Sequence, residues 1–308
     1  MNSAAVRPWQ SRVVLANLVA QTLIVLTGGL VRLTSSGLGC PTWPECVSGS
    51  VIPTSSQTQT WHKYIEFGNR MLTFVLVIVA GATIFAILRH NKDRIAHGLP
   101  SRRRLTALSV GSMAGIFAQA ILGGITVLTG LNPLTVASHF LLSIGLISIA
   151  YRLKYRLTQP GDDTSTLVVH PLIRTFLNIH VALASAILVL GTLVTGSGPH
   201  AGDSAQVKRL SFNPQIISWV HADVVLLLLG VTIGLYVAVR ATNAPRTVIN
   251  ASLAVLVIGF GQGLIGYVQY FTGLPWVEVA LHMSGACLLW IATLALWSKS
   301  ATHDAQAL

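Results

Sequence analysis

Eight apolar runs, each long enough to cross a lipid bilayer, constrain this sequence more than any other feature. An α-helix rises about 1.5 Å per residue, so roughly 20 apolar residues span a hydrocarbon core about 30 Å thick. Backbone groups in hydrocarbon must satisfy their own hydrogen bonds, so we expect these runs to be helices. The runs cover residues 13–31, 69–88, 105–128, 134–151, 176–194, 216–239, 248–271 and 277–297.

The composition and the placement of charge exclude two classes of protein. Charged residues make up only 9% of the chain, whereas a soluble domain carries about 25%. The net charge of +11 would suit a nucleic-acid partner. However, the Lys and Arg residues lie in short clusters between the apolar runs, as membrane topology signals do, and no basic and aromatic surface is indicated. The expected surroundings are membrane lipid, with no nucleic acid.

The distribution of Lys and Arg predicts how the chain is oriented. Fifteen of the 20 Lys and Arg residues lie on one side of the alternating segments, and the positive-inside rule places that side, with both termini, in the cytoplasm. The run 13–31 is long for a signal-peptide core and no cleavage site follows it, so we expect a retained first helix. The sequence therefore predicts a multi-pass protein of the plasma membrane, with Cys40 and Cys46 in an outer loop.

An internal repeat divides the chain into two halves. Residues 117–139 read FAQAILGGITVLTGLNPLTVASH, and residues 260–282 read FGQGLIGYVQYFTGLPWVEVALH. Both contain F-x-Q, TGL and a final His in one register. An even number of helices per repeat gives both repeats the same orientation. The sequence therefore predicts an all-α membrane protein of two parallel four-helix bundles, an N-terminal half over 1–160 and a C-terminal half over 161–308.

Three histidines lie at matching depth near the outer side of the membrane. His139, His221 and His282 each lie a few residues inside an apolar run, where ionisable side chains are rare and usually functional. The repeat aligns Asn69 with His221, so one half offers Asn69 with His139 and the other offers His221 with His282. Two imidazoles on facing helices can bind a haem iron from both sides. A lone His more often bonds a neighbouring helix, but three at one depth favour metal binding.

A carboxylate and a cysteine pair accompany these histidines. Glu66 lies three residues before Asn69 and shares its helix face, so it is a candidate to orient a ligand or move protons. Pairing with Arg70 at the membrane edge is the alternative. Cys40 and Cys46 lie in the outer segment GLGCPTWPECVSG, where oxidising conditions allow a disulfide. That bond is either a staple of the loop or, if exposed and strained, a redox group.

Taken together, these features resemble the haem A synthases over nearly the whole chain. The resemblance includes GGLVRLTSSGLGCPTWPEC, E-x-x-N-R at Glu66–Arg70, the TGL…H repeat and HAD at His221. That family converts haem O to haem A by oxidising a ring methyl to a formyl group. The resemblance implies haem b on His221 and His282, a haem O site on His139, and Glu66 as the catalytic carboxylate.

The resemblance also implies partners and further contacts. It matches Cys40 and Cys46 to the family's outer-loop cysteines, while a second pair found in some members is absent from 196–215. A haem O synthase and a terminal oxidase are the implied partners, and the electron donor is unknown. Arg70, or alternatively Arg32, is expected to pair with haem propionates; interfacial anchoring is the other reading of both.

One residue departs from the family pattern. The pattern E-x-x-H-R is usual, but this chain has Asn69 in place of the histidine. Asparagine is a poor iron ligand, so we expect His139 to hold the substrate haem alone, with an open sixth position that suits oxygen binding. His62 is the alternative ligand, but it lies about 10.5 Å of helical rise before Asn69. Using it would require the haem to move or the helix start to unwind.

The predicted function is therefore that of a haem A synthase, a membrane oxidoreductase that acts on haem O with a bound haem b. Two other functions stay open. A di-haem b-type electron carrier would oxidise quinol without changing a haem, and a haem-free transporter would also suit parallel repeats and buried histidines. A chemically changed haem separates the synthase from the first alternative, and any bound haem separates it from the second.

Overall fold

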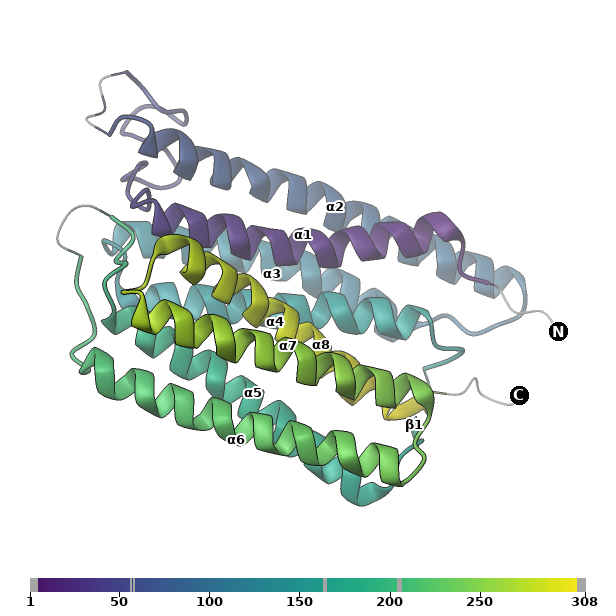
Figure 1. The fold of residues 1–308 in the computed structure, drawn as a ribbon. Coiled ribbons are helices and arrows are strands. Elements are labelled where there is room, and N and C mark those ends of the chain that lie inside the picture. The colour runs from purple at the N-terminus through teal and green to yellow at the C-terminus, as the bar shows by residue number, and fades with distance from the viewer. Residues whose placement is uncertain (1–4, 56, 58, 163–164, 204–206, 304–308) are drawn as a thin grey trace.

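The computed structural model describes residues 5–55, 57, 59–162, 165–203 and 207–303, and within them the chain forms eight long α-helices (Figure 1). Each predicted run lies inside one helix. The helices are α1 (Pro8–Leu33), α2 (His62–Ala96), α3 (Arg103–Leu128), α4 (Pro133–Leu157), α5 (Pro171–Ser197), α6 (Pro214–Ala241), α7 (Arg246–Phe271) and α8 (Trp276–Lys299).

Proline and asparagine define the starts of α4 and α6. Pro133 and Pro214 occupy the first helical position, where the missing N–H costs little. The side chains of Asn132 and Asn213 accept N–H groups of the first turn, which would otherwise lack partners. These caps place the residues that follow at a defined depth in each helix.

The helices extend beyond the apolar runs, and α2 does so most. It begins seven residues before the predicted run 69–88 and ends eight residues after it. The added turns carry polar residues such as Lys63 and Arg94. Hydropathy marks only the part of a helix that suits hydrocarbon, whereas the hydrogen-bonded helix continues into the polar boundary on both sides.

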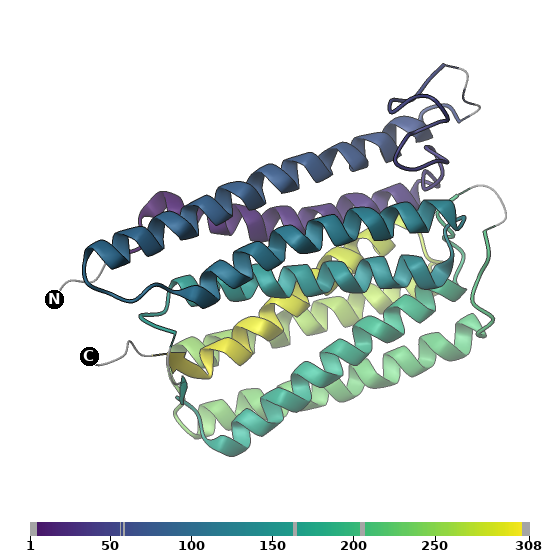
Figure 2. The ribbon, with the colours of Figure 1, turned by 180° about the vertical axis from the view of Figure 1, so that it is seen from behind.

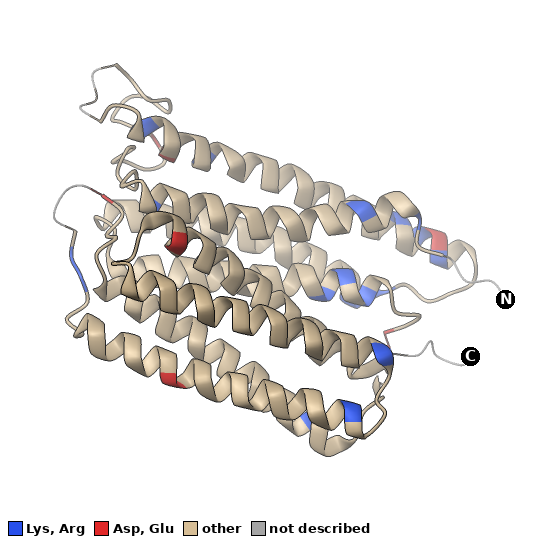
Figure 3. Cartoon of the chain, in the orientation of Figure 1, with Lys and Arg blue, Asp and Glu red and all other residues tan. Residues whose placement is uncertain are grey.

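The outer surface of the bundle is apolar. All eight helices are long and apolar enough to cross a membrane, and large side chains such as Ile78, Val257 and Leu264 are exposed. Figure 3 shows that charged residues gather toward the two ends of the bundle, and that both termini lie at the same end. Lipid rather than water suits such a surface. The fold is that of a multi-pass membrane protein.

The helices pack as two rings of four (Figures 1 and 2). In the N-terminal half each helix packs against its neighbours in sequence and α1 closes on α4; in the C-terminal half α5 closes on α8. The halves meet where α1 contacts α8 and where α4 contacts both α5 and α8. Helices α2 and α4 are therefore diagonal partners, as are α6 and α8. The predicted all-α fold of two bundles is confirmed, and its division into domains at residue 160 stays a prediction.

The repeated TGL segment makes the same turn in both halves. Gly130 and Gly273 have φ of 63° and 82°, and Leu131 and Leu274 follow with φ of 58° and 61°. Such left-handed conformations favour glycine. Each leucine N–H bonds back to a carbonyl of the helix that has just ended. Because the turns are alike, α4 and α8 start alike, and the repeated histidine lies at the same depth in both.

The structure also contains a short sheet that the sequence did not predict. Strands β1 (Ser165–Leu167) and β2 (Ala301–His303) pair antiparallel. They tie the segment after α8 to the connection between α4 and α5. Strands of three residues are too short for a detectable alternation of polar and apolar residues, and their pairing joins segments far apart in the sequence.

Candidate functional site

The two histidines of the C-terminal half lie close together between diagonal helices. His221 is the eighth residue of α6 and His282 the seventh of α8. Their ring centroids are 6.5 Å apart, with 69° between the ring planes. Two imidazoles that bind one ion from opposite sides have centroids about 6 Å apart, because each metal–nitrogen bond is about 2 Å and each ring adds roughly 1 Å. The pair therefore fits a haem iron between the rings.

The orientation of these rings also fits a metal site. Nδ1 of His221 and of His282 is buried and lacks a hydrogen bond of good geometry within the described residues. The carbonyls of Ile187 on α5 and Gln262 on α7 nevertheless interact with the two rings. A ligating histidine commonly turns its second nitrogen to a carbonyl, which fixes the ring. A ring held in this way through Nδ1 would offer Nε2 to an ion.

Each histidine ring lies against a glycine of the preceding helix. A Cβ at Gly191 would lie 3.5 Å from His221 Cε1, and one at Gly266 would lie 3.2 Å from His282 Cε1. In the N-terminal half, a Cβ at Gly123 would lie 3.1 Å from Cε1 of His139. The glycines therefore provide the space that the rings occupy.

The N-terminal half repeats the arrangement with one change of residue type. Asn69 is the eighth residue of α2 and His139 the seventh of α4, so they occupy the positions that correspond to the two histidines of the other half. Nδ2 of Asn69 lies 3.9 Å from where a Cβ of Gly28 would be. Its Oδ1 is buried and makes no hydrogen bond within the described part of the chain. This half therefore offers one imidazole and one amide.

The alternative ligand His62 lies at the outer end of α2. Its Nδ1 is 3.1 Å from Ser36 Oγ, and its ring stacks on that of Trp61 with the centroids 4.0 Å apart. The helix is continuous from His62 through Asn69, so roughly 10 Å of rise separates them. The structure does not bring His62 to the depth of His139, and this favours His139 as the single imidazole of the site.

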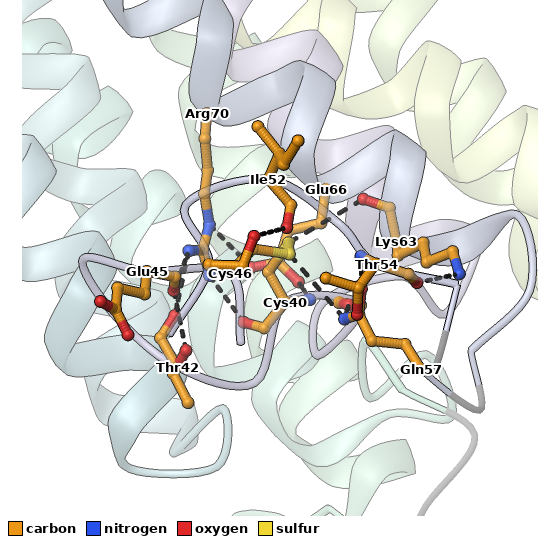
Figure 4. The surroundings of a disulfide bond; sticks show 12 residues. Cys40, Thr42, Glu45, Cys46, Ile52, Thr54, Gln57, Lys63, Glu66 and Arg70 are labelled. Atoms are coloured by element: carbon orange, nitrogen blue, oxygen red, sulfur yellow. Dashed lines mark hydrogen bonds and ion pairs between the residues drawn. A yellow bond between two sulfur atoms is a disulfide. The ribbon is translucent and has the colours of Figure 1, made fainter. Parts of the chain in front are cut away.

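Glu66 is buried and held by the loop between α1 and α2 (Figure 4). Its Oε2 accepts the Cys40 N–H at 2.7 Å, and its Oε1 accepts Nη2 of Arg70 at 2.6 Å. Cys40 and Cys46 form the expected disulfide. Both cysteines are fully buried, which favours the staple over an exposed redox group. The loop thus holds the predicted catalytic carboxylate in place.

Arg70 uses all five of its N–H groups inside this cluster. Nε and Nη2 donate to Glu66, Nη2 also donates to the Cys40 carbonyl, and Nη1 donates to the carbonyls of Thr42 and Glu45. A guanidinium has five donors and no acceptor. Pairing of Arg70 with a haem propionate stays a prediction, and it would require the exchange of one of these bonds.

The outer loops join the two halves. Arg32 of α1 donates to the carbonyls of His200 and Thr195 at 2.8 and 2.7 Å. The Gly37 N–H donates to the Gly202 carbonyl at 2.7 Å. The disulfide loop of the N-terminal half is therefore bound to the connection between α5 and α6. Arg32, like Arg70, has protein partners in the place where a propionate was expected.

Gln119 and Gln262 support the site, although the sequence did not identify them as site residues. Gln119 Nε2 donates to the His139 carbonyl at 3.0 Å, and Gln262 Nε2 donates to the His282 carbonyl at 2.8 Å. Each ties the backbone of a candidate ligand to the neighbouring helix. The repeated F-x-Q carried the signal, because it keeps a constant distance in sequence from the histidine, but a glutamine in an apolar run has many potential partners.

These features define a multi-pass helical membrane protein of two related halves, with half-buried histidines at equivalent positions on its helices. A model of the cytochrome oxidase assembly protein family matches residues 11–206, which is more than half of the chain. The chain belongs to this family, and its resemblance to the haem A synthases is confirmed.

Several relatives are named heme A synthase. That of Lysinibacillus sphaericus is 35% identical over 133 residues, which cover 43% of this chain and 39% of the relative. That of Geobacillus kaustophilus is 29% identical over 118 residues, covering 38% and 33%. That of Shouchella clausii is 31% identical over 150 residues, covering 47% and 46%. The chain thus spans less than half the length of these relatives.

Proposed function

We propose that this protein is a haem A synthase, a membrane oxidoreductase that converts haem O to haem A by oxidising a ring methyl to a formyl group. The observation that carries the proposal is the family match over 11–206, because that segment contains Glu66, Asn69, Arg70 and His139. The relatives named heme A synthase support the same activity.

In the C-terminal half, His221 and His282 hold haem b. The 6.5 Å between their ring centroids supports this assignment. When bound, haem b would supply a redox centre that exchanges electrons with the substrate site. The chain orients the ligands: Gly191 and Gly266 give the rings their space, and Gln262 fixes the backbone at His282. Such supporting contacts keep a ligand in its productive orientation.

In the N-terminal half, His139 binds the iron of the substrate haem O. Converting a methyl to a formyl group replaces two hydrogens of the reacting carbon with one oxygen atom, so C–H bonds must break and the site needs a group that exchanges protons. Glu66 is that group in this proposal, because it is buried one turn before Asn69 on the same helix face and carboxylates so placed act in acid–base catalysis. Arg70 and the Cys40 N–H keep its oxygens in place.

The same proposal places the protein in a reaction sequence. A haem O synthase supplies the substrate, and a terminal oxidase takes up the haem A. The helices lie in the plasma membrane with both termini in the cytoplasm, as the excess of Lys and Arg on that side favours.

The test is mass spectrometry of haem extracted from membranes that contain the protein and a supply of haem O. Haem A, or the alcohol between haem O and haem A, is expected with the intact chain and with His97→Ala, an exposed control at the inner end of α2. It is expected to disappear with His139→Ala and with Glu66→Gln. Unchanged haem O beside bound haem b would instead indicate the di-haem electron carrier, and absence of any haem the transporter.

A further inference from the structure

We propose that the Asn69 amide hydrogen-bonds a small ligand bound to the substrate haem at the position opposite His139. The inference rests on the proposed haem site at His139 and goes beyond it. It gives the asparagine a positive role in ligand recognition, rather than only the absence of an iron ligand.

Asn69 occupies a position that is equivalent to those of the three histidines. Three of the four equivalent positions hold histidine, and each of those rings has its Cε1 edge against a glycine. Asn69 has the same relation to Gly28, with Nδ2 nearest the glycine. The amide therefore takes the place that an imidazole takes at the corresponding position of the other half, on the helix diagonal to that of His139.

The Asn69 side chain can form hydrogen bonds but is poorly suited to bind iron. An asparagine side chain is shorter than histidine and its neutral amide is a poor ligand for iron, so it would not coordinate an iron held by His139. It offers both donors and an acceptor, which suits a ligand atom bound to iron. Oδ1 of Asn69 is buried with no hydrogen bond in the described chain. Buried polar atoms are nearly always satisfied, and a bound ligand or water would supply the partner.

The neighbouring polar side chains of Glu66 and Arg70 already have hydrogen-bond partners in the protein. Both oxygens of Glu66 accept bonds from Cys40 N–H and Arg70. All five N–H groups of Arg70 donate to Glu66 and to loop carbonyls. Of the three polar residues in E-x-x-N-R, Asn69 is the one with an unsatisfied buried atom.

Carbon monoxide binding to the reduced, haem-loaded protein tests the proposal. A haem held by both His221 and His282 would have no open position, so the probe would report the N-terminal haem alone. The native chain is expected to bind CO at a five-coordinate, high-spin haem. Asn69→Leu is expected to bind CO roughly threefold to tenfold more weakly, the worth of one hydrogen bond. Its C–O stretch should move to higher wavenumber, because the amide dipole no longer acts on the bound oxygen.

Asn69→His supplies a second variant with a different expected signature. The imidazole should coordinate the iron, convert the N-terminal haem to a low-spin six-coordinate form and suppress CO binding. The control is Asn178→Leu, which removes an exposed asparagine of α5 that bonds to Trp297 and should leave CO binding unchanged. Spectra rather than turnover give each answer, so a failed haem O conversion does not affect them.

Two results would overturn the inference and spare the proposed function. One is a native N-terminal haem that is already low-spin and excludes CO. The other is an Asn69→Leu protein with the CO affinity and C–O stretch of the native chain. A protein that carries haem only between His221 and His282, even with haem O supplied, would overturn both proposals together.

Discussion

At the residue scale, the rings of His139 and His282 depend on glycines that leave almost no spare room. A Cβ at Gly123 or Gly266 would lie 3.1 or 3.2 Å from a ring carbon, whereas carbon atoms in good contact are about 3.5–4.0 Å apart. Glycine inside a helix costs roughly 0.5–1 kcal/mol relative to alanine. Its recurrence at the same place in both repeats indicates that ring placement outweighs this loss of helix stability.

We therefore expect Gly266→Val to weaken the retention of the haem b proposed between His221 and His282. The added side chain must displace the His282 ring, and overpacking of this kind costs about 1–3 kcal/mol. Gly261→Val on the same helix is the matched control, because a Cβ there meets nothing within 4 Å. The measurement is haem b per protein after purification, with the low-spin spectrum. Equal haem content in both variants would contradict the role given to Gly266.

At the element scale, the connection between α1 and α2 acts as a cap on the N-terminal bundle. Carbonyls of Cys40, Thr42 and Glu45 bind Arg70, and the Cys40 N–H binds Glu66. A Cβ at Gly124 of α3 would lie 2.4 Å from the Trp43 ring, so the loop also packs closely on the bundle. The loop and the outer end of α2 therefore form one hydrogen-bonded unit around the carboxylate.

Replacement of both Cys40 and Cys46 by Ser should loosen this unit. Opening so short a loop removes about 2 kcal/mol of stabilisation, and Glu66 loses a fixed N–H partner. We expect haem O conversion to fall much more than haem b content, since His221 and His282 lie in the other half. Cys287→Ala, which removes a buried free thiol, is the control. Equal losses of conversion and haem b would show that the loop stabilises the whole fold rather than the Glu66 site.

At the scale of the whole molecule, the end that carries the termini is held by an ion pair between two connections. Arg102, which precedes α3, has a side chain only 3% exposed and donates to Asp162 at 2.8 Å. It also donates to the carbonyls of Arg156, Gln159 and Gly161. This residue thus joins the α2–α3 connection to the α4–α5 connection, and with it the ends of four helices.

Stability should consequently fall in acid as Asp162 is protonated. Burial raises the pKa of Asp162. Hydrogen bonds and charge from Arg102 and Arg156 lower the pKa by more than burial raises it, so the pKa lies below its usual value. The unfolded pKa is about 3.9. The stabilisation is therefore complete above about pH 4 and is lost as the pH falls through the lower pKa of the folded state.

The measurement is thermal unfolding in detergent as a function of pH. Asp162→Asn should be less stable at neutral pH by about 1–3 kcal/mol and should lack this acid component. Asp93→Asn is the control, because its partners Arg7 and Arg89 are far more exposed and exposed pairs contribute about 0–1 kcal/mol. An unchanged acid response in Asp162→Asn would assign that response to other groups.

Labelling of introduced cysteines tests the orientation of the whole molecule in the membrane. In a chain that carries Cys287→Ala, Ser55→Cys in the α1–α2 loop should react with an impermeant maleimide on intact cells. Ser101→Cys, between α2 and α3, should react only after the membrane is opened. These positions lie at opposite ends of the long helix α2. The reverse pattern would place the termini outside.

The eight helices, the two related halves and the depth of the candidate ligands follow from the sequence alone. Hydrocarbon forces an apolar run of this length to be a helix, and a repeat in constant register places equivalent residues at equal depth. His139 and His282 could therefore be found from their position in the repeat, and His221 from its place a few residues inside its apolar run. The departure at Asn69 was also visible, because the residues around it keep the pattern.

Which helices lie diagonally opposite, and hence the 6.5 Å between the rings of His221 and His282, follows from tertiary packing and could not be read from the sequence. A helix that is apolar on most sides does not encode which face meets which neighbour. The sequence likewise does not encode the contacts of Gln119 and Gln262, or those of the loop atoms that hold Glu66. These contacts join backbone and side-chain groups remote in sequence, so they exist only once the bundle and its loops have packed.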